Sequence, residues 1–225
     1  MARRGIFMNT IMSGIMSHGL LLLCLGSATA VSAPLGVRGW YELGGTVIED
    51  AKLESFFDEP VSGKKVKFDP GFRGAIALGK EFSRYVALEA EGGFHYNSIR
   101  SIDGPESDNG ELYQIPVLGN LVLQFPNRIR LVPFIGGGVG GVFNILDGGD
   151  ISLGASRFSG TEETWSFAYQ GYGGLMYSFR PDMALGVSYH YLRNDGPSWD
   201  LGDGRDLKFN RLVNHSLVLT YNFRF

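Results

Sequence analysis

The sequence predicts an all-β fold: an eight-stranded, antiparallel, up-and-down transmembrane β-barrel. Three observations support this prediction. Apolar and polar residues alternate with a period of two. The connections between these segments are alternately short and long, and glycine is abundant, with 33 residues in 225. Only 19% of the residues are charged and 13% are aromatic. This composition excludes intrinsic disorder and is unlike that of a soluble helical domain.

The first thirty residues have the three parts of a cleavable export signal. Arg3 and Arg4 form the basic start, residues 20–25 the apolar centre, and Ala28-Thr29-Ala30 the cleavage site. We expect residues 1–30 to be removed as a signal peptide and residues 31–225 to form one barrel domain. Cys24 does not indicate a lipoprotein, because Leu23 precedes it where a small residue is required. The mature chain then has no cysteine, which suits an oxidising compartment.

Charge excludes one class of partner. The chain carries 20 basic and 23 acidic residues, a formal net charge of -3. Removal of the two arginines in the signal peptide lowers the net charge of the mature chain to -5. A nucleic-acid-binding domain would have a basic surface instead.

Five segments alternate between apolar and polar or small residues, which is the pattern of a strand with one apolar face. They are residues 36–48, 71–80, 86–96, 114–125 and 216–225. Three further strands are expected near residues 130–146, 165–179 and 183–193. Eight strands of this length, close to the ~9–11 residues that cross a bilayer at a tilt, suit a membrane barrel.

The facing of residues 130–146 stays open at this stage. Phe134 and Val142 lie on one face of the expected strand, and three apolar residues lie on the other. Those three are Ile135, Val139 and Phe143.

The connections alternate in length. Short links are expected at Glu81–Arg84, Pro126–Ile129 and Arg180–Asp182, and long polar loops at residues 49–70, 98–111, 147–164 and 194–211. Short periplasmic turns and longer extracellular loops are typical of outer-membrane barrels. A soluble lipocalin-like barrel, the alternative, does not need this asymmetry. The four loops hold 18 of the 23 acids and nine basic residues, so we expect long acidic loops outside the cell.

The last strand has the most specific pattern. The chain ends on Phe225, and apolar residues occupy every second position before it: Leu217, Leu219, Tyr221 and Phe223. A terminal aromatic residue on an alternating strand resembles the signal that the outer-membrane barrel assembly machinery reads. We therefore expect that machinery to be a partner during biogenesis.

Several segments together resemble the family of small outer-membrane β-barrels related to opacity-type porin-like proteins, similar in form to the membrane domain of outer membrane protein A. These segments are Phe68-Asp-Pro-Gly-Phe72, Ala87-Leu-Glu-Ala-Glu91, Gln114-Ile-Pro-Val117 with Asn120, Val132-Pro-Phe134 with the glycines after it, and Tyr189-His-Tyr191. The resemblance spans residues 35–225. It implies the barrel fold and no catalytic residues. The chain departs from the family pattern at His190, where arginine is more usual, and this departure affects the expected internal charge pairing.

One expected strand carries a cluster of titratable residues. Glu89, Glu91 and His95 share its polar face, and a hairpin that pairs residues 75 and 91 would place Arg73 diagonally beside Glu91. An acid–base pair or a proton path is one interpretation. We favour an internal salt-bridge network, since an eight-stranded barrel is filled by side chains.

Other motifs also favour structural roles. Gly136–Gly141 matches a dinucleotide-binding glycine pattern, but no helix start follows it. His215 and Ser216 are adjacent on a strand and so face opposite ways. Ser188 and His190 share a face, but we expect them to lie too far apart for a hydrogen bond, without an orienting acid. We therefore expect no enzyme activity and no catalytic, cofactor-binding or metal-binding residues.

Loop residues offer two weaker hypotheses. Asp200, Asp203 and Asp206 could hold a divalent cation, although solvated loop acids are the favoured interpretation. Trp165 and Trp199 lie at strand–loop borders, where we expect them to anchor the barrel at the membrane interface.

The function that follows is that of an integral outer-membrane protein with a structural or surface-interaction role, expected to be a monomer in contact with outer-membrane lipid and lipopolysaccharide. A narrow porin-like channel for small solutes is the alternative, and a lipid-modifying enzyme is a weaker one. The surface ligand is not identified by the sequence.

Overall fold

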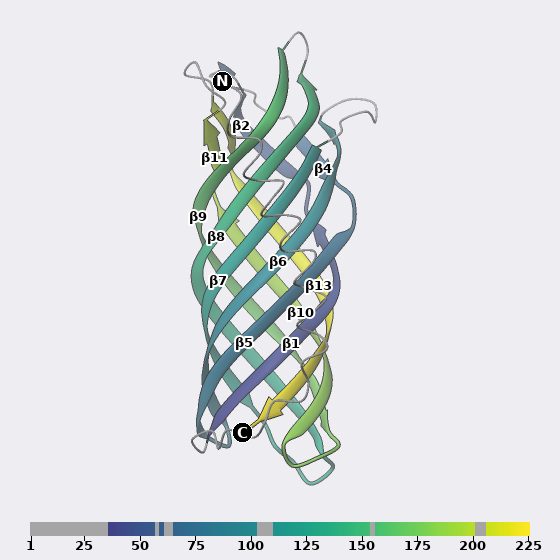
Figure 1. Cartoon of the computed structure of the whole chain (residues 1–225), viewed down its shortest axis with the longest axis vertical. Coiled ribbons are helices and arrows are strands. Elements are labelled where there is room, and N and C mark those ends of the chain that lie inside the picture. Colours follow the sequence, from purple (N-terminus) through teal and green to yellow (C-terminus); the bar gives the residue numbers. More distant parts are fainter. Residues whose placement is uncertain (1–35, 57–58, 61–64, 103–109, 154–155, 201–205) are drawn as a thin grey trace. The chain divides into compact units, whose positions relative to one another are not determined.

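A computed structural model describes residues 36–56, 59–60, 65–102, 110–153, 156–200 and 206–225 (Figure 1). The expected signal peptide and Cys24 lie outside the described residues. No helix in the described part of the chain is long and apolar enough to cross a membrane.

Eight antiparallel strands close into a ring, as predicted. They are β1 (Val37–Ile48), β5 (Gly71–Ser83), β6 (Val86–Ile102), β7 (Gly110–Gln124), β8 (Leu131–Leu153), β9 (Ser156–Ser178), β10 (Met183–Asp195) and β13 (Arg211–Arg224). Each strand pairs with the next one along the chain, and β1 pairs with β13 to close the ring. Closure removes both free sheet edges, so every strand of the wall has two neighbours.

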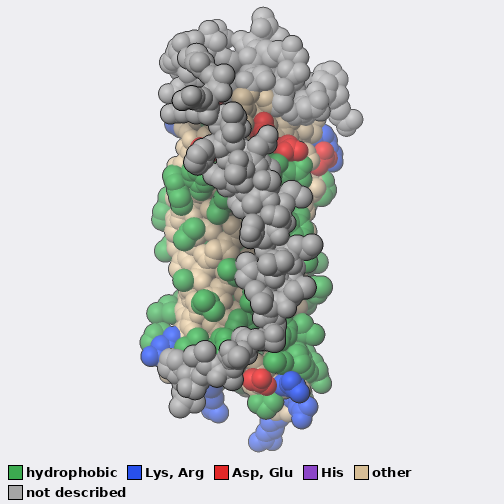
Figure 2. Space-filling model, viewed as in Figure 1, with side chains coloured by type: hydrophobic (Ala, Val, Ile, Leu, Met, Phe, Trp, Pro, Cys, Tyr) green, Lys and Arg blue, Asp and Glu red, His purple; other side chains and the backbone are tan. Residues whose placement is uncertain are grey.

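The two faces of the wall have opposite chemistry. Leu121 and Leu219 are exposed on the outside, whereas Asn120 and Thr220, their chain neighbours, are buried inside. Strand β8 resolves the open question of its facing: Phe134 and Val142 are buried, whereas Ile135 and Val139 are exposed. Figure 2 shows hydrophobic side chains over the outer surface of the barrel. An apolar outside and a polar inside are the reverse of a soluble barrel.

The predicted long polar loops contain strands, which is a correction: residues 147–153 and 156–164 belong to β8 and β9, and short strands occupy parts of the first and last loops. Five short strands lie there: β2 (Ala51–Phe56), β3 (Glu59–Pro60), β4 (Lys65–Phe68), β11 (Ser198–Asp200) and β12 (Asp206–Phe209). Strand β4 pairs with the far end of β6, β2 pairs with β4, and β12 joins β2 to β11. Strand β6 extends beyond its partner β5, and its unpaired edge gives these segments a place to pair.

The first turn has a different register from the predicted one. Residue 91 pairs with Ala77, and Ala75 pairs with Gly93. A bulge between Glu81 and Ser83 shifts the pairing by one residue, so that Ser83 pairs with Val86 across the turn. In a bulge, two residues of one strand lie opposite one residue of its partner, so alternation within each strand does not fix the register of the hairpin.

Two glycines of β8 make room for large side chains inside the barrel. A Cβ atom at Gly138 would overlap the Asn120 side-chain oxygen and lie 2.8 Å from the Gly119 carbonyl oxygen. A Cβ atom at Gly136 would lie 2.6 Å from the Tyr172 hydroxyl. The glycine run therefore has a packing role, and it lies within one strand with no helix after it.

Substitution of Gly138 by alanine tests this packing. We expect Gly138→Ala to lower the free energy of unfolding by about 1–3 kcal/mol, the usual cost of overpacking, measured from urea unfolding in detergent micelles. Gly171→Ala is the matched control, because no atom lies within 4 Å of its Cβ position. Equal effects of the two substitutions would contradict a packing role for Gly138.

Candidate functional site

The centre of the barrel holds an ion-paired cluster, which we name the central layer. Arg73 Nη2 lies 2.9 Å from Glu91 Oε1 and 3.2 Å from Glu42 Oε2, and all three side chains are at most 2% exposed. Asn120 and Gln170 donate hydrogen bonds to the other Glu91 oxygen, at 2.6 and 2.5 Å. The predicted contact between Arg73 and Glu91 is confirmed, although the register differs.

His190 completes the central layer. Its Nε2 atom lies 3.1 Å from Glu42 Oε1, and its ring stacks on Tyr172 at a centroid distance of 4.7 Å. Ser188 and Thr220 also lie within hydrogen-bond distance of Glu42 Oε1. The layer thus draws polar side chains from seven of the eight ring strands.

A second ion-paired cluster, the lower layer, lies toward the short turns. Arg38 contacts Glu89 at 2.7 Å and Glu81 at 3.3 Å, and Arg224 contacts Glu81 at 2.9 Å. Trp40 donates a hydrogen bond to Glu89 at 2.7 Å. The two layers together contain four carboxylates and three guanidinium groups.

Toward the loops, an amide layer follows. Asn214 donates to Gln114 at 2.6 Å, Gln114 donates to Asn144 at 3.1 Å, and Asn194 donates to Asn144 at 2.7 Å. His95 Nδ1 lies 3.2 Å from the Asn214 amide nitrogen. This layer carries hydrogen bonds across the barrel from β6 to β10 without an ion pair.

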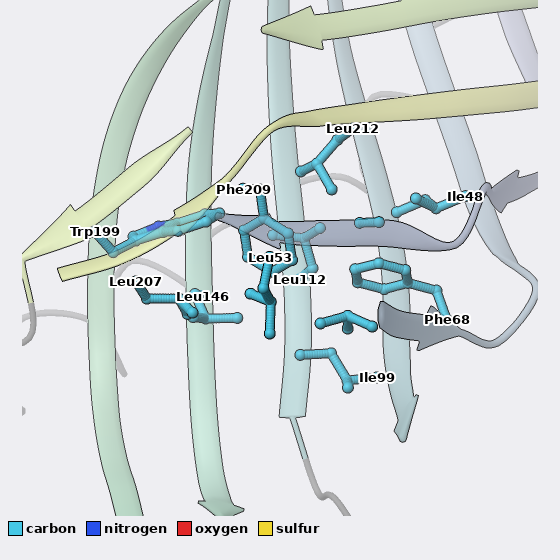
Figure 3. Packing of buried hydrophobic residues seen from close by; sticks show 12 residues of the cluster. Ile48, Leu53, Phe68, Ile99, Leu112, Leu146, Trp199, Leu207, Phe209 and Leu212 are labelled. Atoms are coloured by element: carbon cyan, nitrogen blue, oxygen red, sulfur yellow. The ribbon is translucent and has the colours of Figure 1, made fainter. Parts of the chain in front are cut away.

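Above the amide layer, twelve buried apolar residues form what we name the apolar cap (Figure 3). Five of them point inward from ring strands: Ile48, Ile99, Leu112, Leu146 and Leu212. The other seven come from the short strands: Ala51, Leu53, Val66, Phe68, Trp199, Leu207 and Phe209. Because β1 and β13 lie across the ring from β7 and β8, this cluster bridges the interior.

Trp199 is a correction to the sequence analysis. Its side chain is fully buried in the apolar cap and packs edge-on against Phe209 at 5.5 Å, so it is no membrane anchor. Trp165, by contrast, is 61% exposed on the outer wall, as expected for an anchor. Trp165 lies within β9 and not at a strand–loop border as predicted, whereas Trp199 is buried because β11 folds over the barrel.

Ser188 and His190 are a second correction. Ser188 Oγ lies 3.1 Å from His190 Nε2, and Glu42 is the acid that the sequence did not reveal. In a hydrolytic triad, the nucleophile and the acid bind opposite ring nitrogens. Here both bind Nε2, and the group is buried beneath the apolar cap. The geometry therefore suits a structural network better than acyl transfer.

His215 faces outward, as predicted, and Ser216 faces inward. His215 Nε2 lies 2.9 Å from Glu49, and its Nδ1 hydrogen-bonds the Tyr189 hydroxyl. These contacts connect β13, β10 and the residue directly after β1 on the outer wall. Sequence reasoning missed them because the three residues come from distant segments.

The proposed cation site falls largely outside the described part of the chain. Asp203 is not described, and of Asp200 and Asp206 only the backbone pairing between β11 and β12 is described. Among the described residues, no group of three or more His, Cys, Asp or Glu residues could hold a metal ion.

A polar interior, an apolar outer wall and a closed ring are the features of an outer-membrane barrel. Residues 19–225 match the family model described as "Outer membrane protein beta-barrel domain". The chain belongs to this family. Its members reside in the outer membrane of Gram-negative cells, and the family has varied roles.

A curated relative supports membership of this outer-membrane barrel family. The chain is 28% identical over 191 residues to an "Outer membrane protein" of Gluconacetobacter diazotrophicus, a match that covers 73% of this chain. The chain spans about half the length of that curated relative, 49%.

Two solved outer-membrane barrels share the fold. OprG from Pseudomonas aeruginosa has a TM-score of 0.57 and 12% identity, covering 85% of this chain and 97% of that one. Neisserial surface protein A has a TM-score of 0.54 and 15% identity, covering 84% and 97%. At these identities the likeness concerns the fold alone.

The central layer generates a stability prediction. We expect Arg73→Leu to lower the free energy of unfolding by about 3–5 kcal/mol, because it leaves Glu42 and Glu91 buried without a positive partner. Arg100→Leu is the control: it breaks the exposed Arg100–Asp69 pair and should cost about 0–1 kcal/mol. Urea unfolding in micelles measures both variants. A loss at Arg73 no larger than at Arg100 would contradict the assignment.

Proposed function

We propose that this protein is a sealed structural barrel that displays an ordered acidic surface outside the cell, rather than a channel or an enzyme. The observation that carries the proposal is the filled interior. Two ion-paired layers, an amide layer and the apolar cap lie one above another across the ring. Water and ions that cross the barrel would have to separate the buried ion pairs of both layers and also displace a packed apolar cluster.

The short strands beyond the barrel support a surface role. Strands β11, β12, β2 and β4 form a continuous sheet within the described parts of the first and last long connections. Residues predicted to lie outside the cell include 18 of the 23 acids. A fixed acidic surface suits contact with a basic or cation-bridged partner.

Three partners belong to this proposal. The exposed apolar wall would contact outer-membrane lipid, and lipopolysaccharide would surround the loop end. The barrel assembly machinery would read β13, where Leu217 and Leu219 are among the most exposed apolar residues and Phe225 is 52% exposed. A monomer satisfies all of these contacts.

Conductance measurements test whether the barrel is sealed. We expect the folded protein, inserted in planar lipid bilayers, to give no current steps above the background. Heat-modifiable migration on gels provides the control that the inserted protein is folded. Resolved current steps whose size changes in a Glu91→Gln variant would contradict the proposal, because Glu91 faces only the interior.

Cysteine labelling tests the orientation. We expect a membrane-impermeant maleimide to label a Lys65→Cys variant in intact cells and to leave an Arg128→Cys variant unlabelled. Lys65 lies at the loop end and Arg128 in a short turn, and both are exposed. The unsubstituted chain is the control for reaction elsewhere. Labelling of Arg128→Cys alone would reverse the proposed orientation.

A further inference from the structure

The short-turn end of the barrel carries five exposed basic residues without a carboxylate partner among the described residues: Lys80, Arg84, Arg128, Arg130 and Arg180. We name this set the basic rim. All three short turns contribute to it. Figure 2 shows Lys and Arg side chains gathered at this end of the barrel. The acids of the short turns do not neutralise the rim. Glu81 is already paired with Arg38 and Arg224, and Asp182 is the one other acid in the described short turns.

At the opposite end of the barrel, basic residues form ion pairs with acidic residues of the same chain. Lys65 pairs with Asp50, Arg100 with Asp69, and Lys208 with Glu54. Arg193 pairs with Asp195. Most of the basic residues that the structure describes at the loop end thus have acidic partners, whereas those of the basic rim have none among the described residues.

The depth of the basic rim indicates which partner that is. Exposed aromatic residues lie beside it: Tyr85 in the first short turn, Phe125 directly after β7 and Tyr177 near the end of β9, which are 45%, 50% and 50% exposed. Aromatic rings of this kind mark the border of the bilayer. Arg84 lies over the Tyr85 ring, 4.7 Å from its centroid. Its guanidinium group is therefore held at the level where lipid headgroups begin.

Lys80 shows the same arrangement along one strand. Ile76, Leu78, Lys80 and Phe82 alternate on the outer face of β5, and all four are exposed. Lys80 lies one outward position beyond Leu78, a distance of about 7 Å along the strand. A lysine at this place can keep its stem on the apolar wall and its ammonium group among headgroups.

We propose that the basic rim binds the phosphate groups of anionic phospholipids in the inner leaflet of the outer membrane. Arginine donates paired hydrogen bonds to phosphate oxygens, and lysine adds a point charge. Contributions from all three turns distribute these sites around the barrel, so the rim selects a shell of lipids and not a single molecule. The assignment to the inner leaflet rests on the proposed orientation, whereas the preference for anionic lipid does not.

Spin-label measurements of lipid selectivity test the rim directly. The full chain is folded into phosphatidylcholine vesicles that contain a trace of spin-labelled lipid. The association of spin-labelled phosphatidylglycerol with the protein is then compared with that of spin-labelled phosphatidylcholine. We expect the relative association constant to favour phosphatidylglycerol about fivefold, the ratio given by about 1 kcal/mol for a basic residue near an anionic surface. At 1 M NaCl, where screening acts within about 3 Å, the preference should largely disappear.

Two charge-matched variants separate the rim from net charge. In the first, Lys80, Arg84, Arg128, Arg130 and Arg180 are all replaced by glutamine, and the preference should fall close to one. In the second, Lys52, Lys65, Lys67, Lys208 and Arg211 at the loop end are replaced by glutamine, and the preference should persist. Heat-modifiable migration verifies that each variant is folded. If the fivefold rim variant does not fold, a double variant with Arg128→Gln and Arg130→Gln is used in its place. We then expect a preference for phosphatidylglycerol between that of the unsubstituted protein and one.

The outcomes distinguish this proposal from the proposed function. No preference in the unsubstituted protein, or equal losses in the two variants, would overturn lipid binding by the rim. A lower yield in cells with unchanged lipid selectivity would also overturn it, in favour of a protein partner. Reversed cysteine labelling would instead overturn the orientation while leaving the anionic preference intact, because vesicles carry the same lipid in both leaflets.

Discussion

Arg73, held between Glu42 and Glu91, is the interaction on which the interior of the barrel depends. A ring of eight strands is just wide enough for side chains to fill it. Every second residue of each strand must therefore enter a narrow space without lipid and with little water. Carboxylates in such a space are tolerated only when positive groups and hydrogen-bond donors surround them. The same requirement explains the lower layer, where Arg38 stands between Glu81 and Glu89.

Filling the interior with long polar side chains imposes a condition on the wall. Asn120 reaches Glu91 only because its neighbour on β8 is Gly138, and Tyr172 finds room against Gly136. Glycine in a strand normally weakens it, because it packs nothing and costs conformational entropy. Here that cost is offset by an interior in which every strand but β8 contributes a polar side chain to one network.

The apolar cap solves a different problem. The ring strands extend beyond the polar layers, and their inward residues there are apolar, as Leu112 and Leu146 show. Left open, these residues would face water. The short strands of the first and last long connections supply Leu53, Trp199 and Phe209 to cover them. The short strands are consequently held over the barrel by burial of these apolar side chains.

Alternation is a local property, and the sequence by itself therefore determined the positions of the eight ring strands, the facing of five of them and the places of the short turns. Glu91 and Asn120 could be placed inside, and Leu219 outside, because each strand repeats its pattern every two residues. The contact between Arg73 and Glu91 could also be predicted, since a hairpin brings them together. Contacts across the ring could not: Glu42 meets His190 only after β1 and β13 pair, and the stagger between strands decides which inward residues share a layer. Trp199 was misplaced for the same reason. Its burial depends on β11 and β12 folding over the barrel, and nothing in a three-residue strand shows where it docks. Only the closed tertiary structure decided these pairings, because they join residues more than a hundred positions apart whose meeting depends on the curvature and register of the whole sheet.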